Sequence, residues 1–200
     1  AVSGSKIPVI ASINCVSDSE WYDFAAKVEE AGAHALELNV YFLPAGKSAG
    51  SQNYEKLYLD IAEKVKRRIN IPVIMKLGQN FTNLIQLVDL LYHRGIDGVV
   101  LFNRFYNPDI NIKEMKMTSS DVFSTPAELR HSLRWVAIIS SLVKQVDIAA
   151  STGIHDAKGM IKQLLAGAKA VQVCSAIYKN GPSHITGMLG ELRDWMEMFS

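Results

Sequence analysis

Residues 30–39 read EAGAHALELN, and the same pattern returns as HRGIDGVVLFN at residues 93–103 and as LAGAKAVQVCS at residues 165–175. In each stretch, sequence typical of a helix ends at a glycine, and a hydrophobic run follows within about three residues and stops at a polar residue. Glycine suits the left-handed conformation that ends many helices. The three stretches therefore predict repeated units in which a helix leads directly into a buried strand.

Two of these units also begin alike, with the tetrapeptide Ile-Pro-Val-Ile around Pro8 and again around Pro72. Proline is tolerated at the first position of a strand, where its missing N–H costs least. Pro8 stands about 31 residues before Asn39, as one strand–helix–strand unit requires. Pro72 precedes Asn103 by the same distance. We interpret the two units as an internal duplication.

Strands and helices alternate along the whole chain. The predicted strands are residues 8–13, 35–40, 72–77, 98–102, 147–151 and 170–174. The predicted helices are residues 18–31, 52–69, 81–93, 127–144, 156–167 and 183–198. Several strands are apolar without interruption, which is typical of a parallel sheet covered by helices.

Such alternation yields either an open doubly wound sheet or a closed barrel. No Gly-x-Gly-x-x-Gly turn follows a strand, which argues against a dinucleotide-binding open sheet. We predict an α/β fold, a TIM (β/α)8 barrel, with about six βα units visible and residues 1–200 in one domain. Since a complete barrel has eight strands, we expect the first two units to precede this sequence, which then forms the C-terminal three-quarters of the barrel.

Residues 109–117, DINIKEMKM, interrupt the alternation of strands and helices. Apolar and polar residues alternate there with a period of two, which predicts an antiparallel excursion in the loop after the fourth strand. Long loops at this end of a barrel usually cover the ligand site.

The composition narrows the class of protein. The chain has 200 residues, 48% of them hydrophobic, and a formal net charge of +1, which gives no basic field for nucleic acid. The longest apolar runs have the length of a strand and the opening residues do not resemble a signal peptide, so we expect a cytoplasmic protein without a membrane span. Cys15 and Cys174 are interpreted as buried, reduced thiols, and no cysteine or histidine spacing indicates a metal site.

The carboxyl ends of parallel strands share one face, where barrels place their ligands. The residues expected on that face are Ser12, Asn14, Asn39, Lys76, Asn103, Ser151, Thr152, Gly153, Cys174 and Ser175. One lysine among amides and hydroxyls suits a flat, neutral or anionic ligand better than a metal. Lys76 is predicted to point inward, where an ammonium needs an anion beside it, although a lysine that reaches solvent from the strand end is the alternative. Asn39 and Asn103, taken singly, also suit turns, but their repeated position favours function.

The last two strand ends predict an anion site. Thr152-Gly153 and Cys174-Ser175 each precede a helix, and the last two loops of barrels are the usual place for a phosphate. His155 is either a further phosphate contact or a solvent-facing residue.

Taken in order, six motifs resemble successive strand motifs of the dihydroorotate dehydrogenase family: PVIASI (8–13), ELN (37–39), PVIMKL (72–77), VLFN (100–103), STGI (151–154) and LAGAKAVQVCSA (165–176). The resemblance covers essentially the whole chain. It implies a TIM barrel that holds FMN at its C-terminal face, and an oxidoreductase that acts on CH–CH groups in pyrimidine biosynthesis. It also implies that Lys76 approaches the flavin ring and that Asn39 and Asn103 bind a pyrimidine substrate. The further cofactor contacts that it implies, around the FMN phosphate, are Ser151, Thr152, Gly153, Cys174 and Ser175.

The sequence departs from the family pattern after Asn39. Family members continue into a Ser-Cys-Pro-Asn type segment, and a Cys or Ser of that loop is the general base. Here Phe42 stands at the position of the base and Pro44 at that of a second substrate-binding Asn. Neither side chain accepts a proton, so the catalytic residue is unknown, and Ser48 and Ser51 are candidate substitutes. In the phosphate loops, Thr-Gly and Cys-Ser stand where the family usually has Gly-Gly and Gly-Thr.

Three hypotheses follow. The first is an FMN-dependent oxidoreductase that transfers hydride between a pyrimidine-like small molecule and FMN. The second is a degenerate flavin-binding homologue without turnover, which Phe42 and Pro44 favour. The third is a non-redox, phosphate-binding barrel, a lyase or isomerase, in which Lys76 forms a Schiff base. We expect no nucleic-acid or membrane partner and leave a homodimer open.

Overall fold

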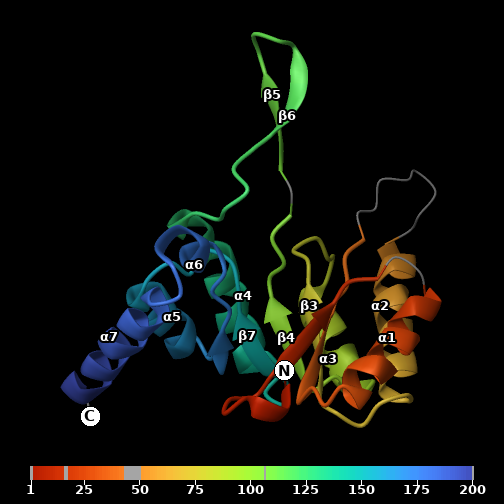
Figure 1. Cartoon of the computed structure of the whole chain (residues 1–200). Coiled ribbons are helices and arrows are strands. Elements are labelled where there is room, and N and C mark those ends of the chain that lie inside the picture. The colour runs from red at the N-terminus through yellow and green to blue at the C-terminus, as the bar shows by residue number, and fades with distance from the viewer. Residues whose placement is uncertain (1, 16–17, 43–50, 106, 200) are drawn as a thin grey trace.

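The computed structural model describes residues 2–15, 18–42, 51–105 and 107–199. Within them, the main sheet consists of parallel strands in the order β1 (Ile10–Ile13), β2 (Ala35–Asn39), β3 (Val73–Leu77), β4 (Gly98–Leu101), β7 (Asp147–Ala150) and β8 (Ala170–Val171). The spatial order follows the chain, and the sheet curls as part of a barrel (Figure 1). The prediction of an incomplete TIM barrel is confirmed.

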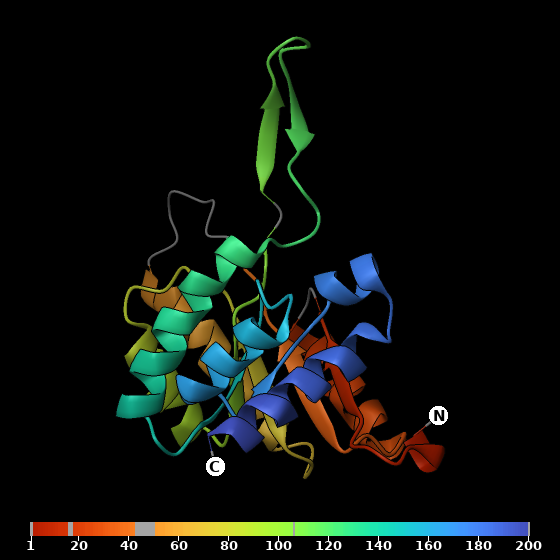
Figure 2. The same ribbon diagram turned by 90° about the vertical axis from the view of Figure 1, so that its left-hand side faces the viewer.

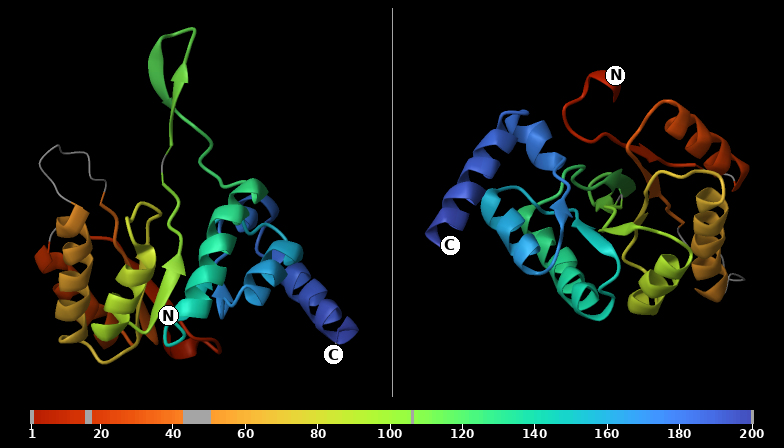
Figure 3. Two further views of the ribbon diagram at one scale, coloured as in Figure 1. Left: turned by 180° about the vertical axis from the view of Figure 1, so that it is seen from behind. Right: turned by 90° about the horizontal axis from the view of Figure 1, so that it is seen from below.

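Helices lie on the outer side of the curled sheet (Figure 3). They are α1 (Asp18–Glu30), α2 (Ser51–Lys66), α3 (Leu84–His93), α4 (Leu129–Leu142), α5 (Ala157–Leu165) and α7 (His184–Met198), with the short elements η1 (Val2–Gly4), η2 (Pro126–Glu128) and α6 (Ser175–Asn180). Gly32, Gly95 and Gly167, which follow helices, have φ of 82°, 86° and 110°, so the predicted left-handed helix ends are confirmed. In the part of the chain that the structure describes, no helix is long and apolar enough to cross a membrane.

Alternate residues of the strands separate the core from the hollow of the curl. Met75 and Leu77 of β3 are fully buried in one cluster with Leu87 of α3, on the outer face of the sheet. Ile74 and Lys76 face the other way and line a cavity of about 700 Å³ inside the curl. A charged side chain on this inner face therefore needs a partner from another strand.

The predicted antiparallel excursion is confirmed as a hairpin of β5 (Pro108–Asn111) and β6 (Lys116–Ser119). The hairpin projects beyond the carboxyl ends of the barrel strands (Figures 1 and 2). The hairpin therefore lies at the same end of the molecule as the residues that the sequence predicts to bind a ligand.

The prediction of two buried cysteines is wrong for one of them. Cys15 is buried, and burial, together with the charge of Glu20, raises the pKa of its thiol. Cys174 is exposed. The reason is that β8 ends at Val171, earlier than predicted, so that Cys174 lies beyond the sheet.

Candidate active site

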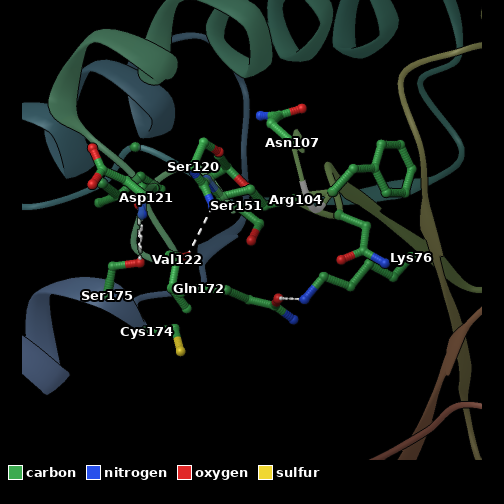
Figure 4. Close-up of a pocket in the computed structure, with 16 residues that line it drawn as sticks. Lys76, Arg104, Asn107, Ser120, Asp121, Val122, Ser151, Gln172, Cys174 and Ser175 are labelled. Carbon is green, nitrogen blue, oxygen red and sulfur yellow. Dashed lines mark hydrogen bonds between the residues drawn. The ribbon is translucent and has the colours of Figure 1, made fainter. Parts of the chain in front are cut away.

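A crevice of about 380 Å³ lies at the carboxyl ends of β3, β4, β7 and β8 (Figure 4). The predicted site residues that line this crevice are Lys76, Asn103, Ser151, Thr152, Gly153, Cys174 and Ser175. Asn39 reaches the crevice through a hydrogen bond to Asn103. Ser12 lines the hollow below, and Asn14 is exposed beyond β1. The structure thus brings residues from separate strands to one face.

Lys76 points into this crevice, and its ammonium has two partners. Its Nζ donates a hydrogen bond to Gln172 Oε1 at 2.8 Å (Figure 4) and lies 3.8 Å from Glu37 Oε1. The side chain of Lys76 is 17% exposed. The alternative of a lysine extended into solvent is therefore wrong, since Lys76 is paired inside the barrel mouth.

Asn39 and Asn103 form a direct amide pair. Asn103 Nδ2 donates to Asn39 Oδ1 at 2.6 Å, and the backbone N–H of Asn103 donates to the carbonyl of Leu77. Because this pair uses one group of each carboxamide, Asn39 Nδ2 and Asn103 Oδ1 remain for a ligand. A donor beside an acceptor suits the edge of a flat ring that carries an N–H next to a carbonyl.

The loop after β7 is shaped by two successive residues with positive φ. Thr152 has φ of 74° and Gly153 of 81°. The Thr152 hydroxyl donates to the carbonyl of Phe102 at 3.0 Å, which ties the loop to the end of β4. A Cβ on Gly153 would lie 2.2 Å from the backbone nitrogen of Leu129, so this position requires glycine. Thr152 adopts the conformation that glycine would supply, at a cost in strain.

Ser124, which no sequence pattern marked, closes one end of the crevice beside Ser175. Its Oγ lies 3.0 Å from His155 Nε2 and 3.1 Å from Ser175 Oγ, and its N–H donates to Ser175 Oγ at 3.0 Å. Burial and the charge of Lys179 lower the pKa of His155, so that a neutral imidazole faces these hydroxyls. His155 is half-buried and its ring contacts the crevice through Ser124, while its role as a phosphate contact stays a prediction. Because Ser124 lies in a loop far from Ser175 in the chain, no local pattern marked it.

Aromatic rings surround Phe42, the residue that the family resemblance places at the position of the general base. Phe42 packs edge-on against Tyr58 at 6.2 Å between ring centroids, and Tyr41 lies over Phe105 at 3.9 Å. These rings border a second cavity of about 270 Å³. Tyr58 Oη donates to the carbonyl of Val40 at 3.2 Å, and burial raises its pKa to about 12, so it stays protonated at neutral pH. The structure does not describe Pro44, which stands at the position of the family's second substrate-binding Asn. It also does not describe Ser48 or the side chain of Ser51, the two residues suggested as replacements for the base.

The parallel, curled sheet and the polar crevice at its carboxyl end define a ligand-binding protein of the TIM-barrel class. A sequence profile of the dihydroorotate dehydrogenase family matches residues 2–196, and this chain belongs to that family. Members of the family bind FMN.

Curated relatives are of two kinds. The chain is 29% identical to a dihydroorotate dehydrogenase B (NAD(+)) catalytic subunit of Thermoplasma volcanium, over 96% of this chain and 64% of the relative. It is 31% identical to the protein of that name in Methanothermobacter thermautotrophicus, over 88% of this chain and 60% of the relative. It is 29% identical to a putative dihydroorotate dehydrogenase A (fumarate) of Aeropyrum pernix, over 99% of this chain and 66% of the relative. The chain therefore spans less than two thirds of the length of these relatives.

The residues of the crevice fit FMN. Hydroxyls of Ser124 and Ser175 and the left-handed turn at Thr152 and Gly153 gather at one end, as a phosphate requires. Lys76 supplies a cation at the other end, where a flavin ring carries carbonyl oxygens. The replacement of a usual glycine by Thr152 keeps the backbone conformation of the loop.

Proposed function

We propose that this protein is an FMN-dependent oxidoreductase of the dihydroorotate dehydrogenase type, and that this chain supplies most of its cofactor crevice. The observation that carries the proposal is the arrangement of one paired lysine and one hydroxyl-lined turn at opposite ends of a single crevice. Lys76 would contact the flavin ring. The phosphate would bind at Ser151, Thr152, Gly153, Cys174 and Ser175, with Ser124 beside them. FMN, when bound, supplies the hydride acceptor.

A small planar molecule would bind at Asn39 and Asn103. Their free donor and acceptor match a cyclic amide edge, as in a pyrimidine. The described residues around Phe42 offer rings in place of a base, so removal of a proton from dihydroorotate would be slow. The same rings favour the second candidate, a flavin-binding homologue without turnover.

The Schiff-base alternative is less well supported. A nucleophilic lysine must lose its proton, but the ammonium of Lys76 donates to Gln172 and lies beside the Glu37 carboxylate. These contacts occupy the nitrogen that a Schiff base would use. We therefore assign Lys76 to cofactor binding.

Anaerobic mixing of the full-length protein with dihydroorotate tests the proposed reaction. We expect the flavin absorbance to bleach slowly, about 10²–10⁴-fold below the rate that a positioned base gives. Dithionite should bleach the same flavin at once, which controls for an accessible cofactor. Rapid bleaching by dihydroorotate would show that another residue serves as base.

The hairpin supports a homodimer, which we propose as the assembly in the cytoplasm. Register places Ile110 opposite Met117 on one face of the hairpin, and Ile112 and Met115 lie in the turn that joins β5 to β6. All four side chains are exposed by 60% or more. The opposite face carries Asp109 and Asn111 of β5 with their register partners Thr118 and Lys116 of β6, and the charged residues Lys113 and Glu114 lie in the turn. A flat apolar face without charge is self-complementary about a two-fold axis, and an isolated hairpin is only marginally stable alone.

Further exposed apolar side chains follow the hairpin in the chain. Val122 and Phe123 come shortly after β6, and Tyr178 packs on Phe123 at 5.6 Å between ring centroids. Val122, Phe123 and Tyr178 are all exposed, so they add apolar surface below the hairpin that a second copy would cover. Sedimentation of the full-length protein should give a dimer, and I112D/M115D a monomer. The control K113A/E114A changes the two charged residues of the same turn and should remain dimeric, whereas a monomeric wild type would contradict the proposal.

A further inference from the structure

Glu37 is the most deeply buried charged group beside the crevice among the described residues, at 4% exposure. It stands on β2 and points into the hollow of the sheet, where its two oxygens are fully used. Oε1 accepts from the Ser12 hydroxyl of β1 at 2.7 Å and lies 3.8 Å from Lys76 Nζ of β3. Oε2 accepts from Gln172 Nε2, just beyond β8. One carboxylate therefore links the two edges of the curled sheet.

These contacts determine which way the Gln172 amide faces. Because Nε2 donates to the Glu37 carboxylate, Oε1 must point away from it, and Oε1 is the atom that accepts from Lys76. A carboxylate only accepts hydrogen bonds, so the opposite amide orientation would set two oxygens against each other and an NH₂ group against an ammonium. Glu37 thus determines the acceptor that holds Lys76.

The carboxylate also offsets the charge of Lys76. A buried carboxylate without partners would be costly, and so would an ammonium at the barrel mouth. Salt screens such a pair less than a surface pair, because both groups are largely buried. The charge that the crevice presents to a ligand is therefore reduced by Glu37.

We propose that Glu37 is a positioning residue that acts on Lys76 through Gln172: it fixes the place of the ammonium and sets the net charge next to the flavin ring. The proposal rests on the proposed function only for its effect on FMN. The orientation and charge of Lys76 are testable without any cofactor.

The first test uses the FMN-free, full-length protein and amine acylation, with Lys76 followed by peptide mapping. Glu37→Gln keeps the shape but removes the charge, so Lys76 should be acylated about tenfold faster than in the wild type, the scale of one such charge pair. Glu30→Gln removes an exposed carboxylate of α1 and should leave the rate unchanged. An unchanged rate in folded Glu37→Gln would overturn the proposal.

The second test exchanges the two side chains. E37Q/Q172E returns a carboxylate to the cluster, now in direct contact with Lys76, and acylation should return to within about threefold of the wild-type rate. Should Glu37→Gln alone not fold, this variant decides: protection of Lys76 supports the proposal, and tenfold faster acylation overturns it.

The reduction potential of bound FMN is the matching cofactor readout, and it should rise in Glu37→Gln because an uncompensated cation stabilises the anionic reduced flavin. Failure of the wild type to bind FMN would count against the proposed function alone, since the acylation result stands apart from it.

Discussion

The carboxamides of Asn39 and Asn103 meet across the end of β3, with 2.6 Å between Asn39 Oδ1 and Asn103 Nδ2. Asn39 ends β2 and Asn103 follows β4 by two residues, so equivalent positions of the two repeated sequence units bring a pair of amides together. The pairing leaves one donor and one acceptor, which we propose bind the substrate.

Substitution of this pair should weaken the binding of the substrate but not that of the cofactor. We expect Asn103→Ala to raise KM for a cyclic amide substrate, or its Kd in a variant without turnover, about tenfold, because one hydrogen bond is lost and Asn39 loses its orientation. Flavin fluorescence should show FMN affinity within about twofold of the wild type. Equal losses in both affinities would mean that the pair supports the crevice as a whole.

Gly153 should tolerate no side chain. Gly153→Ala places a Cβ 2.2 Å from the backbone nitrogen of Leu129, at a φ of 81°. We expect a loss of about 2 kcal/mol or more in the free energy of unfolding. Gly190→Ala is the matched control, because nothing lies within 4 Å of its Cβ position in α7, and it should stabilise the helix by roughly 0.5–1 kcal/mol. Thermal denaturation of both variants measures the difference.

Glu128 should make stability depend on pH. Burial raises its pKa, but hydrogen bonds from Arg104 and from Thr125 outweigh burial, and the pKa lies below its ordinary value. Stabilisation by the carboxylate is therefore full above the pKa of the unfolded chain and is lost as the pH falls through the lower value of the folded state. We expect Glu128→Gln to melt below the wild type at neutral pH and the two curves to converge in acid. Glu30→Gln should show no such convergence.

Sequence patterns predicted the elements whose signals are local. Glycine after α1, α3 and α5 marked the strands β2, β4 and β8 that follow, and the alternation along β3 predicted that Lys76 points inward. The partners of Lys76 were not predicted, because Gln172 and Glu37 lie 135 residues apart in the chain and meet only when the sheet curls. Helix α6 was missed since it spans only Ser175–Asn180, too short for a periodic pattern.

The aromatic rings at the base position give a direct mutational prediction. F42C/P44N restores the side chains that the family carries there, and we expect bleaching of the flavin by dihydroorotate to accelerate by about 10² or more. Phe42→Ala is the control, because it opens the cavity without supplying a base, and it should not accelerate the reaction. Equal acceleration in both variants would indicate that access, rather than proton removal, limits the rate.

Binding of FMN in this crevice is tested most directly by the visible spectrum of the purified full-length protein. Chromatography of the released chromophore then identifies it. We expect a flavin spectrum with about one FMN per chain. Lys76→Met should weaken FMN binding about tenfold or more, as expected for loss of one charged hydrogen bond. A colourless protein that also fails to bind added FMN would contradict the account.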